Sequence, residues 1–228
     1  MSEVTQIRAL TPEFRMSFPN LIQPRAFQDK GDQKNYRVEM LFEPEDLKKF
    51  RVENAQKQGL EEADINQILL NFAKDQFPGV NVKQDFQNTW PVRDGSNVAE
   101  SKEADGKRGG DVYRGKKFIR AKSGVDFPPN LMVVEDGKKV TLNRGFDGDM
   151  EKAANLFVGG HYAFAEVVIK AVEVNGIKYM PFYLNSICFT KIGEKFGGQS
   201  LMARYDDVSG GSADVDPTAG SDDDEIPF

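Results

Sequence analysis

The sequence predicts a mainly β protein, an antiparallel barrel of five or six strands with an α-helical insertion. Short runs of alternating apolar and polar residues recur along the chain, and two pairs of these runs are joined by Asp-Gly or Asn-Gly. Helical spacing of apolar residues is concentrated between about 44 and 76. The 228 residues, 39% of them hydrophobic, suffice for one sizeable core. A two-sheet sandwich is the alternative, because strand count alone does not separate the two.

Two alternating runs open the chain. Phe14, Met16 and Phe18 alternate with polar neighbours, and residues 36–42 show the same period of two. Side chains two positions apart lie on the same face of a strand. We therefore predict two strands whose aromatic and aliphatic side chains point into the core.

The helical insertion follows. Pro44 is predicted to begin a first helix, which Gly59 ends. A second helix is predicted over about 62–76, where Ile65, Leu69 and other apolar residues recur at helical spacing. Residues 78–111 are rich in polar and turn residues and are predicted to form flexible loops.

The remaining strands are predicted over 116–123, 131–135, 138–142, 162–174 and 177–192, with a short helix near 150–156. Asn175-Gly176 separates the last two strands and favours a type I′ turn, and Asp136-Gly137 favours a second tight hairpin. Pro181 predicts a bulge or a sheet edge, because it cannot donate a ladder hydrogen bond. Together these elements favour a barrel of the oligonucleotide- and oligosaccharide-binding (OB) type.

The charges divide the chain into two parts. Residues 205–228 hold eight acids and no base, whereas residues 1–204 hold 30 bases against 28 acids. The terminal segment has few apolar side chains and is predicted to be a disordered acidic tail. A slightly basic body with an acidic tail is typical of a protein whose body meets a polyanion.

Several classes of protein are excluded or disfavoured. No run approaches the ~20 apolar residues of a membrane span, and the first ten residues resemble neither a signal nor a transit peptide. We therefore expect a soluble, cytoplasmic protein. Cys188 is the single cysteine, so an internal disulfide and Cys-pair zinc motifs are excluded, and a buried thiol is expected.

Catalytic patterns are weak. His161 is the single histidine, and no Gly-x-Ser-x-Gly motif in the sequence supplies a nucleophile for it to activate. Residues 110–117 resemble a phosphate-binding loop but carry Lys117 where Ser or Thr must bind magnesium. Asp147, Asp149 and Glu151 are best explained as acids in the first turn of a helix. We expect no enzyme activity, cofactor or metal. A metal-dependent nuclease, whose carboxylates meet only in the fold, remains the alternative.

The densest positive stretch is residues 102–122, with eight bases and three acids. Strand parity places Phe118 outward between cations, with Ile119 facing the core. An exposed aromatic among cations suits single-stranded nucleic acid, because bases stack on rings while cations bind phosphates. The candidate DNA-binding residues are Arg15, Arg37, Trp90, Lys107, Arg108, Tyr113, Lys116, Phe118, Arg120 and Lys122. The ordinary alternative is a solvated charged face with Phe118 and Trp90 in the core.

The last residues are Asp222, Asp223, Asp224, Glu225, Ile226, Pro227 and Phe228. This end resembles the acidic tip of bacterial single-stranded-DNA-binding proteins, which ends in aspartates and Ile-Pro-Phe; Glu225 departs from that pattern. Phe228 and Ile226 supply apolar anchors for a partner pocket, and the acids favour a basic one. We hypothesise that the tail competes with DNA for the body when DNA is absent.

The body is similar to the single-stranded-DNA-binding proteins of tailed bacteriophages in its size, early helical insertion, 131–138 hairpin and Gly159-Gly160 before a long strand. The resemblance implies an OB-fold DNA-binding domain over 1–204, with the tail over 205–228. It implies a homodimer that coats single-stranded DNA during replication, recombination and repair in the host-cell cytoplasm. Its tail would recruit DNA polymerase or primase-helicase. Binding of double-stranded DNA or RNA stays open, because phosphate contacts alone do not discriminate.

Overall fold

A computed structural model describes residues 6–26, 34–54, 59–106 and 109–196. They belong to a compact unit comprising residues 1–196, and the second unit comprises 197–228. The predicted acidic tail and Lys107 and Arg108 therefore lie outside the described residues. The division into a domain over 1–204 and a tail over 205–228 stays a prediction.

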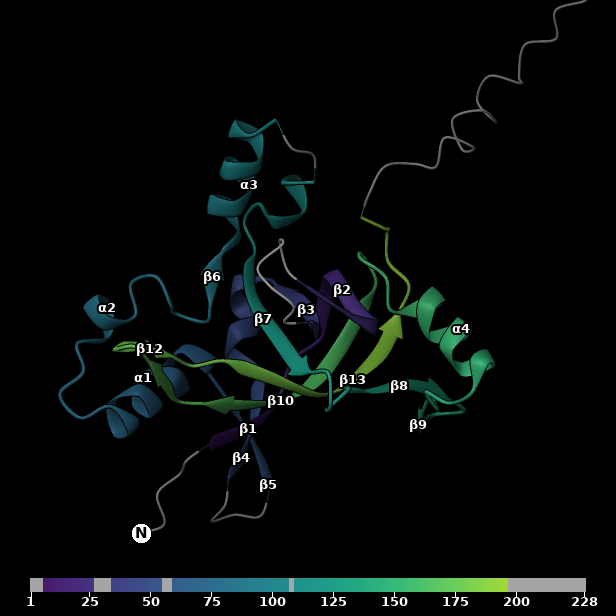
Figure 1. The fold of residues 1–228 in the computed structure, drawn as a ribbon, viewed down its shortest axis with the longest axis horizontal. Helices are drawn as coiled ribbons and strands as arrows, with labels where there is room; N and C mark the ends of the chain where they lie inside the picture. Colours follow the sequence, from purple (N-terminus) through teal and green to yellow (C-terminus); the bar gives the residue numbers. More distant parts are fainter. Residues whose placement is uncertain (1–5, 27–33, 55–58, 107–108, 197–228) are drawn as a thin grey trace, which may run out of the picture. The chain divides into compact units, whose positions relative to one another are not determined.

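Five strands close into a barrel (Figure 1). They are β2 (Phe14–Arg25), β3 (Asn35–Phe42), β7 (Lys117–Gly124), β10 (Tyr162–Lys170) and β13 (Phe182–Lys191). The neighbours run β10-β2-β3-β7-β13, and β13 pairs again with β10 to close the ring. The β7–β13 pairing is parallel and the other four are antiparallel. This mixed five-stranded ring confirms the predicted OB-fold-like barrel.

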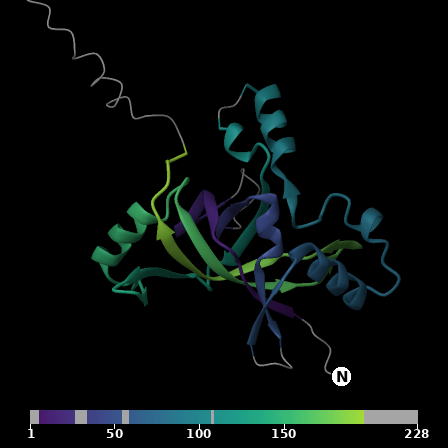
Figure 2. The same cartoon turned by 180° about the vertical axis from the view of Figure 1, so that it is seen from behind.

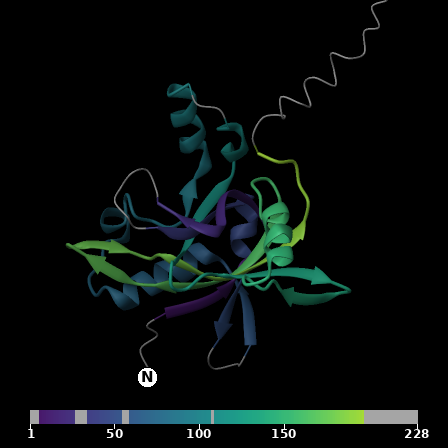
Figure 3. The ribbon, with the colours of Figure 1, turned by 45° about the vertical axis from the view of Figure 1, so that its right-hand side comes forward.

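The sheet extends beyond the barrel on two sides. β1 (Gln6–Leu10), β4 (Phe50–Asn54) and β5 (Gly59–Ala63) continue it from β10, while β8 (Asn130–Glu135) and β9 (Lys138–Thr141) continue it from β13. The two hairpins, β4–β5 and β8–β9, project in different directions from the barrel (Figure 3). Both ends of the extended sheet are thus short edge strands.

Both predicted tight hairpins are confirmed. Asn175 and Gly176 have φ values of 52° and 76°, and Asp136 and Gly137 have 48° and 74°. Asn, Asp and Gly tolerate these left-handed conformations, which the tight turns require. The first turn joins β11 (Val172–Val174) to β12 (Ile177–Tyr179), and Pro181 lies in the break between β12 and β13.

The predicted first helix is wrong. Only a short 3-10 helix, η1 (Pro44–Lys48), forms before the chain enters the β4–β5 hairpin. Phe50 is fully buried and Val52 packs against the core, whereas Arg51 and Glu53 are exposed. This period of two is a strand pattern, and it outweighs the helix start that Pro44 indicates. The second predicted helix is confirmed as α1 (Ile65–Gln76).

The segment predicted as loops over 78–111 contains further elements. They are α2 (Val82–Asp85), β6 (Arg93–Asp94), α3 (Gly95–Ala104) and η2 (Asp111–Tyr113). Asp94 begins α3, because its carboxylate accepts a hydrogen bond from the Ser96 backbone N–H at 2.9 Å. Asp94-Gly95 is one of the turn-type residue pairs that led us to predict loops over this segment, and here it forms the beginning of a helix. We call β6, α3 and η2 the arm; α3 stands apart from the barrel in both Figure 1 and Figure 2.

The core fills the barrel and extends under α1 and α4 (Asp147–Leu156). Phe14, Met16, Val38, Met40 and Ile119 are among its buried side chains. Cys188 is buried as predicted, and burial raises the pKa of its thiol. None of the helices in the described ranges is long and apolar enough to cross a membrane.

Candidate nucleic-acid interface

A groove of about 830 Å³ lies between the arm and the outward face of β3 and β7. We call it the arm groove. Its lining combines four cations, three carboxylates, aromatic rings, two valines and neutral polar side chains. These residues are Phe18, Arg37, Glu39, Gln87, Asn88, Trp90, Val92, Arg93, Asp94, Asn97, Val98, Ser101, Lys102, Asp105, Tyr113, Phe118 and Arg120. Its mouth is open to solvent, as a site for a chain-like ligand requires.

Glu39 holds the floor of the groove together. It lies opposite Arg120 in the β3–β7 register, and the Arg120 Nε donates to its Oε1 at 2.6 Å. The Tyr113 hydroxyl of η2 donates to the other carboxylate oxygen, and it lies 2.7 Å from the Ser17 Oγ of β2. Burial, assisted by Glu39, raises the pKa of Tyr113, so its hydroxyl keeps its proton. Through these bonds Glu39 fastens the arm to the barrel.

Four cations surround this carboxylate. Arg37 and Arg120 come from the barrel, and Arg93 and Lys102 come from the arm. Burial lowers the pKa of Arg37, Arg93 and Lys102, and Arg120 lowers those of the two other arginines further by repulsion. The guanidinium groups nevertheless stay charged at neutral pH. Partly desolvated cations that repel one another would be stabilised by an incoming anion.

Phe18 is the exposed aromatic of the groove. It was predicted to face inward, and this is wrong: 56% of the residue is exposed. Its φ is +44° and the β2–β3 register shifts between Ser17 and Asn20, so a bulge reverses the alternation. A positive φ is costly for a bulky residue and often marks a functional position. The Lys102 Nζ lies 4.8 Å from the centres of both the Phe18 and Tyr113 rings.

Phe118 was predicted to be an exposed stacking ring, and the structure corrects this. It lies on the outward face as strand parity predicted, beside Arg120, but only 1% of it is exposed. Tyr113 of η2 covers it edge to face, with ring centres 5.6 Å apart, and Leu41 completes the cluster. Phe118 and Tyr113, both predicted to be DNA-binding residues, thus belong to a small satellite core between the arm and the barrel.

Trp90 lies at the wall of the groove and is partly buried. Its ring meets Phe86 edge to face at 5.9 Å, and its Nε1 donates to the Asn66 Oδ1 at 3.3 Å. Neutral side chains in the same lining can donate hydrogen bonds to base edges and accept them; these are Gln87, Asn88, Asn97 and Ser101.

A second hollow of about 290 Å³ continues the path along β3 and β7. It shares Arg37, Glu39 and Arg120 with the arm groove and adds Lys122 and Pro181. Lys122 is exposed and lies opposite Arg37 in the register. The two hollows form a track with cations along its length.

Two predicted residues lie elsewhere. The Arg15 Nε donates to the Gly160 carbonyl at 2.9 Å and its Nη2 to the Glu194 carbonyl at 2.6 Å. Its guanidinium lies 4.3 Å from the Phe196 ring centre, outside both hollows. Lys116 forms an ion pair with Glu43 and lines neither hollow. The charges of these two residues therefore serve internal contacts.

Phe18, Arg93 and Lys102 were missed as site residues. Pro19 was the available signal for Phe18, because proline inside a strand indicates a bulge. Lys102 lies in the basic stretch over 102–122, but the loops predicted over 78–111 did not indicate where its side chain points. Arg93 had no local signal, since only the pairing of β6 with β7 brings it to the groove.

Groups suited to other chemistry have structural roles. His161 is buried, and its Nδ1 lies 3.0 Å from the Leu156 carbonyl oxygen. Asp147 and Asp149 lie in the first turn of α4, as predicted. Among the described residues no group of three or more His, Cys, Asp or Glu side chains could hold a metal ion.

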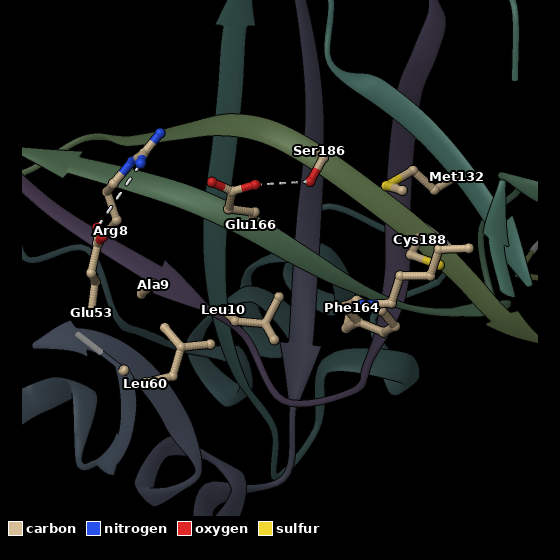
Figure 4. Close-up of a pocket in the computed structure, with 12 residues that line it drawn as sticks. Arg8, Ala9, Leu10, Glu53, Leu60, Met132, Phe164, Glu166, Ser186 and Cys188 are labelled. Atoms are coloured by element: carbon tan, nitrogen blue, oxygen red, sulfur yellow. Dashed lines mark hydrogen bonds and ion pairs between the residues drawn. The ribbon is translucent and has the colours of Figure 1, made fainter. Parts of the chain in front are cut away.

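A third hollow lies on the opposite, outward face of β10 and β13 (Figure 4). It encloses about 490 Å³ and is largely apolar, with Leu10, Leu60 and Phe164 in its lining. Its Arg8 and Glu53 form an ion pair at 4.0 Å. We call it the rear hollow.

Comparisons with known proteins agree with this architecture. The sequence model of a family described as the ssDNA-binding protein of Enterobacter phage Enc34 matches residues 7–216. A solved structure of the bacteriophage Enc34 single-stranded DNA-binding protein in complex with ssDNA has 17% identity and a TM-score of 0.56, covering 86% of this chain and 91% of that one. A solved structure of a C-terminal truncation of the bacteriophage Enc34 protein has 16% identity and a TM-score of 0.55, covering 85% of this chain and 90% of that one. A search of curated proteins found no significant match. Because the family model spans nearly the whole chain, the chain belongs to the phage Enc34 family of single-stranded-DNA-binding proteins.

Proposed function

We propose that the chain binds single-stranded DNA in the arm groove and its continuation along β3 and β7. The observation that carries this proposal is the exposed Phe18 ring beside four clustered cations on the outward face of an OB-type barrel. Membership of the Enc34 family supports it.

The chemistry divides between the two ligand components. Arg37, Arg93 and Lys102 neutralise phosphates and release counterions. Phe18 and the exposed part of Trp90 offer faces on which bases stack, and this requires bases that are not paired in a duplex. Single strands are therefore preferred over duplex DNA.

The proposed wider role builds on single-strand binding. We propose that the protein coats and protects single strands in replication, recombination and repair, in the cytoplasm of a bacterial host. The acidic end of the chain, with Phe228 at its tip, would recruit DNA polymerase or primase-helicase. A homodimer stays a prediction.

The test is a salt-dependent titration of the intact chain with single- and double-stranded DNA of equal length, with and without magnesium. We expect tighter single-strand binding that weakens steeply with salt, and intact DNA in magnesium. Equal or stronger duplex binding would overturn the assigned preference. Magnesium-dependent cleavage of labelled DNA would instead favour a nuclease.

Recruitment needs a separate measurement. The intact chain and its Phe228→Ala variant are compared for binding to the DNA polymerase and primase-helicase that replicate the same DNA. We expect at least one of these proteins to bind the intact chain and to lose most of its affinity for the variant. Equal binding of both chains would contradict a role for the tip.

A further inference from the structure

The two ends of the extended sheet are unpaired edges among the described residues. β5 pairs with β4 and β9 pairs with β8, and no further strand of the described chain covers either. β5 has five residues and β9 has four, and all side chains of β9 are exposed. An open edge presents backbone N–H and C=O groups that another strand can pair with.

The two edges carry opposite charges. β5 exposes Glu61 and Glu62, and β9 exposes Lys138 and Lys139. Two β5 edges would repel one another, as would two β9 edges, whereas a β5 edge attracts a β9 edge. Charge therefore favours one pairing and disfavours the two symmetric ones.

The register of the sheet fixes which side chains would meet. Glu62 lies opposite Arg51, and Arg51 opposite Leu10, on the face that carries the rear hollow. Lys139 lies on the same face, where its Nζ is 4.6 Å from the Phe164 ring centre. An antiparallel pairing that continues both faces therefore sets Glu62 opposite Lys139, and Glu61 diagonal to Lys138 on the other face.

Apolar side chains accompany these charges. Leu60 on β5 is 53% exposed and Val140 on β9 is 38% exposed. The same pairing sets Leu60 beside Thr141 and Val140 beside Glu61, so each apolar side chain gains a covering neighbour. Both edges thus combine hydrogen-bonding groups, apolar surface and matched charge.

From these observations we infer that a second copy of the chain pairs its β9 edge with the β5 edge of the first, head to tail. The contact is heterologous, so each added copy leaves one edge of each kind open. This inference rests on the proposed function. A contact of four or five residues is weak for two free copies, but copies bound to one DNA strand meet at high effective concentration. The edges would therefore make coating cooperative.

The test uses two charge-reversed chains. One carries Glu61→Lys and Glu62→Lys, so both its edges are positive; the other carries Lys138→Glu and Lys139→Glu, so both its edges are negative. Each full-length variant is titrated onto a one-site oligonucleotide and a many-site strand. We expect either variant alone to lose about tenfold in the preference for neighbouring sites. An equimolar mixture should recover it, because copies of the two variants that alternate along the strand pair oppositely charged edges at every junction.

A chain with Glu151→Lys and Glu173→Lys is the matched control for the Glu61→Lys, Glu62→Lys chain. It makes the same charge change at exposed positions away from both edges and should keep its preference for neighbouring sites. Unaltered cooperativity in either edge variant, or none recovered on mixing, overturns the inference. If the unsubstituted chain does not bind the one-site oligonucleotide, the proposed function is overturned instead. The two failures are therefore distinguishable.

Discussion

The outward faces on opposite sides of the barrel differ in how their charges are used. On the β3–β7 face, Arg37, Arg93, Lys102 and Arg120 gather around Glu39. On the β10–β13 face, the rear hollow is mainly apolar, and its Arg8 is paired with Glu53. One face has surplus positive charge, and the other is balanced.

The arm produces this difference. It supplies two of the four cations and covers Phe118 with Tyr113. The rear hollow is flanked by hairpins, and its Phe164 stays partly exposed. An insertion between two barrel strands thus decides which side of a closed barrel can attract a polyanion.

The largest expected effect concerns the cover over Phe118. Phe118→Ala removes a buried ring and should lower the free energy of unfolding by about 3–5 kcal/mol. Phe164→Ala on the rear face should cost less, since its ring is partly exposed. Denaturant unfolding of both variants measures the difference. Equal costs would show that the arm does not seal its face.

Removing groove cations tests the charge difference. Arg37→Ala combined with Arg93→Ala should make the negative slope of log K against log salt shallower by about 1.4, if each arginine neutralises one phosphate of a single strand. Relative to 1 M salt, that corresponds to about 2.5 kcal/mol of binding free energy at 50 mM salt. Arg8→Ala, in the rear hollow, is the matched control and should leave the slope unchanged. A similar loss for Arg8→Ala would place DNA on both faces.

Phe18→Ala tests the exposed ring. Loss of one stacking platform should weaken single-strand binding by about 1–3 kcal/mol, with little change in unfolding free energy because the ring is exposed. Phe146→Ala is the control, since Phe146 is 60% exposed and lines neither hollow of the track. Equal affinities of the two variants would remove Phe18 from the site.

The barrel could be predicted because its signals are local. Period-two alternation and the Asp136-Gly137 and Asn175-Gly176 turns depend on neighbouring residues alone. The groove depends on contacts between distant residues. Phe118 is buried by Tyr113, and Arg93 reaches the site by pairing with Phe118 across 25 positions of the chain.

Two predictions were wrong because a local pattern is compatible with two structures. Asp-Gly marks a turn at Asp136 but caps a helix at Asp94. Alternation predicts an inward Phe18 until the bulge beside Pro19 reverses it. In both cases tertiary contacts of the arm or the groove decide which local structure forms. Strand parity and residue propensity alone do not determine it.

The smallest expected effect concerns the cap of the arm. Asp94→Ala removes the N-cap of α3 and should cost about 1 kcal/mol, while also loosening the wall of the groove and weakening DNA binding. Asp64→Ala removes the equivalent cap of α1, which accepts from the Asn66 N–H at 2.9 Å, and should lower stability without altering binding.

The hydrogen bond from Lys117 lowers the pKa of Asp94 below its ordinary value. Because the folded pKa is the lower one, the stabilisation is complete above about pH 4 and is lost as pH falls through the folded value. Denaturation of wild type and Asp94→Ala at pH 7 and pH 3 should therefore show a gap that narrows at the lower pH. A constant gap would mean that the carboxylate charge takes no part in holding the arm, and the groove face would then owe its wall to Glu39 and Tyr113 alone.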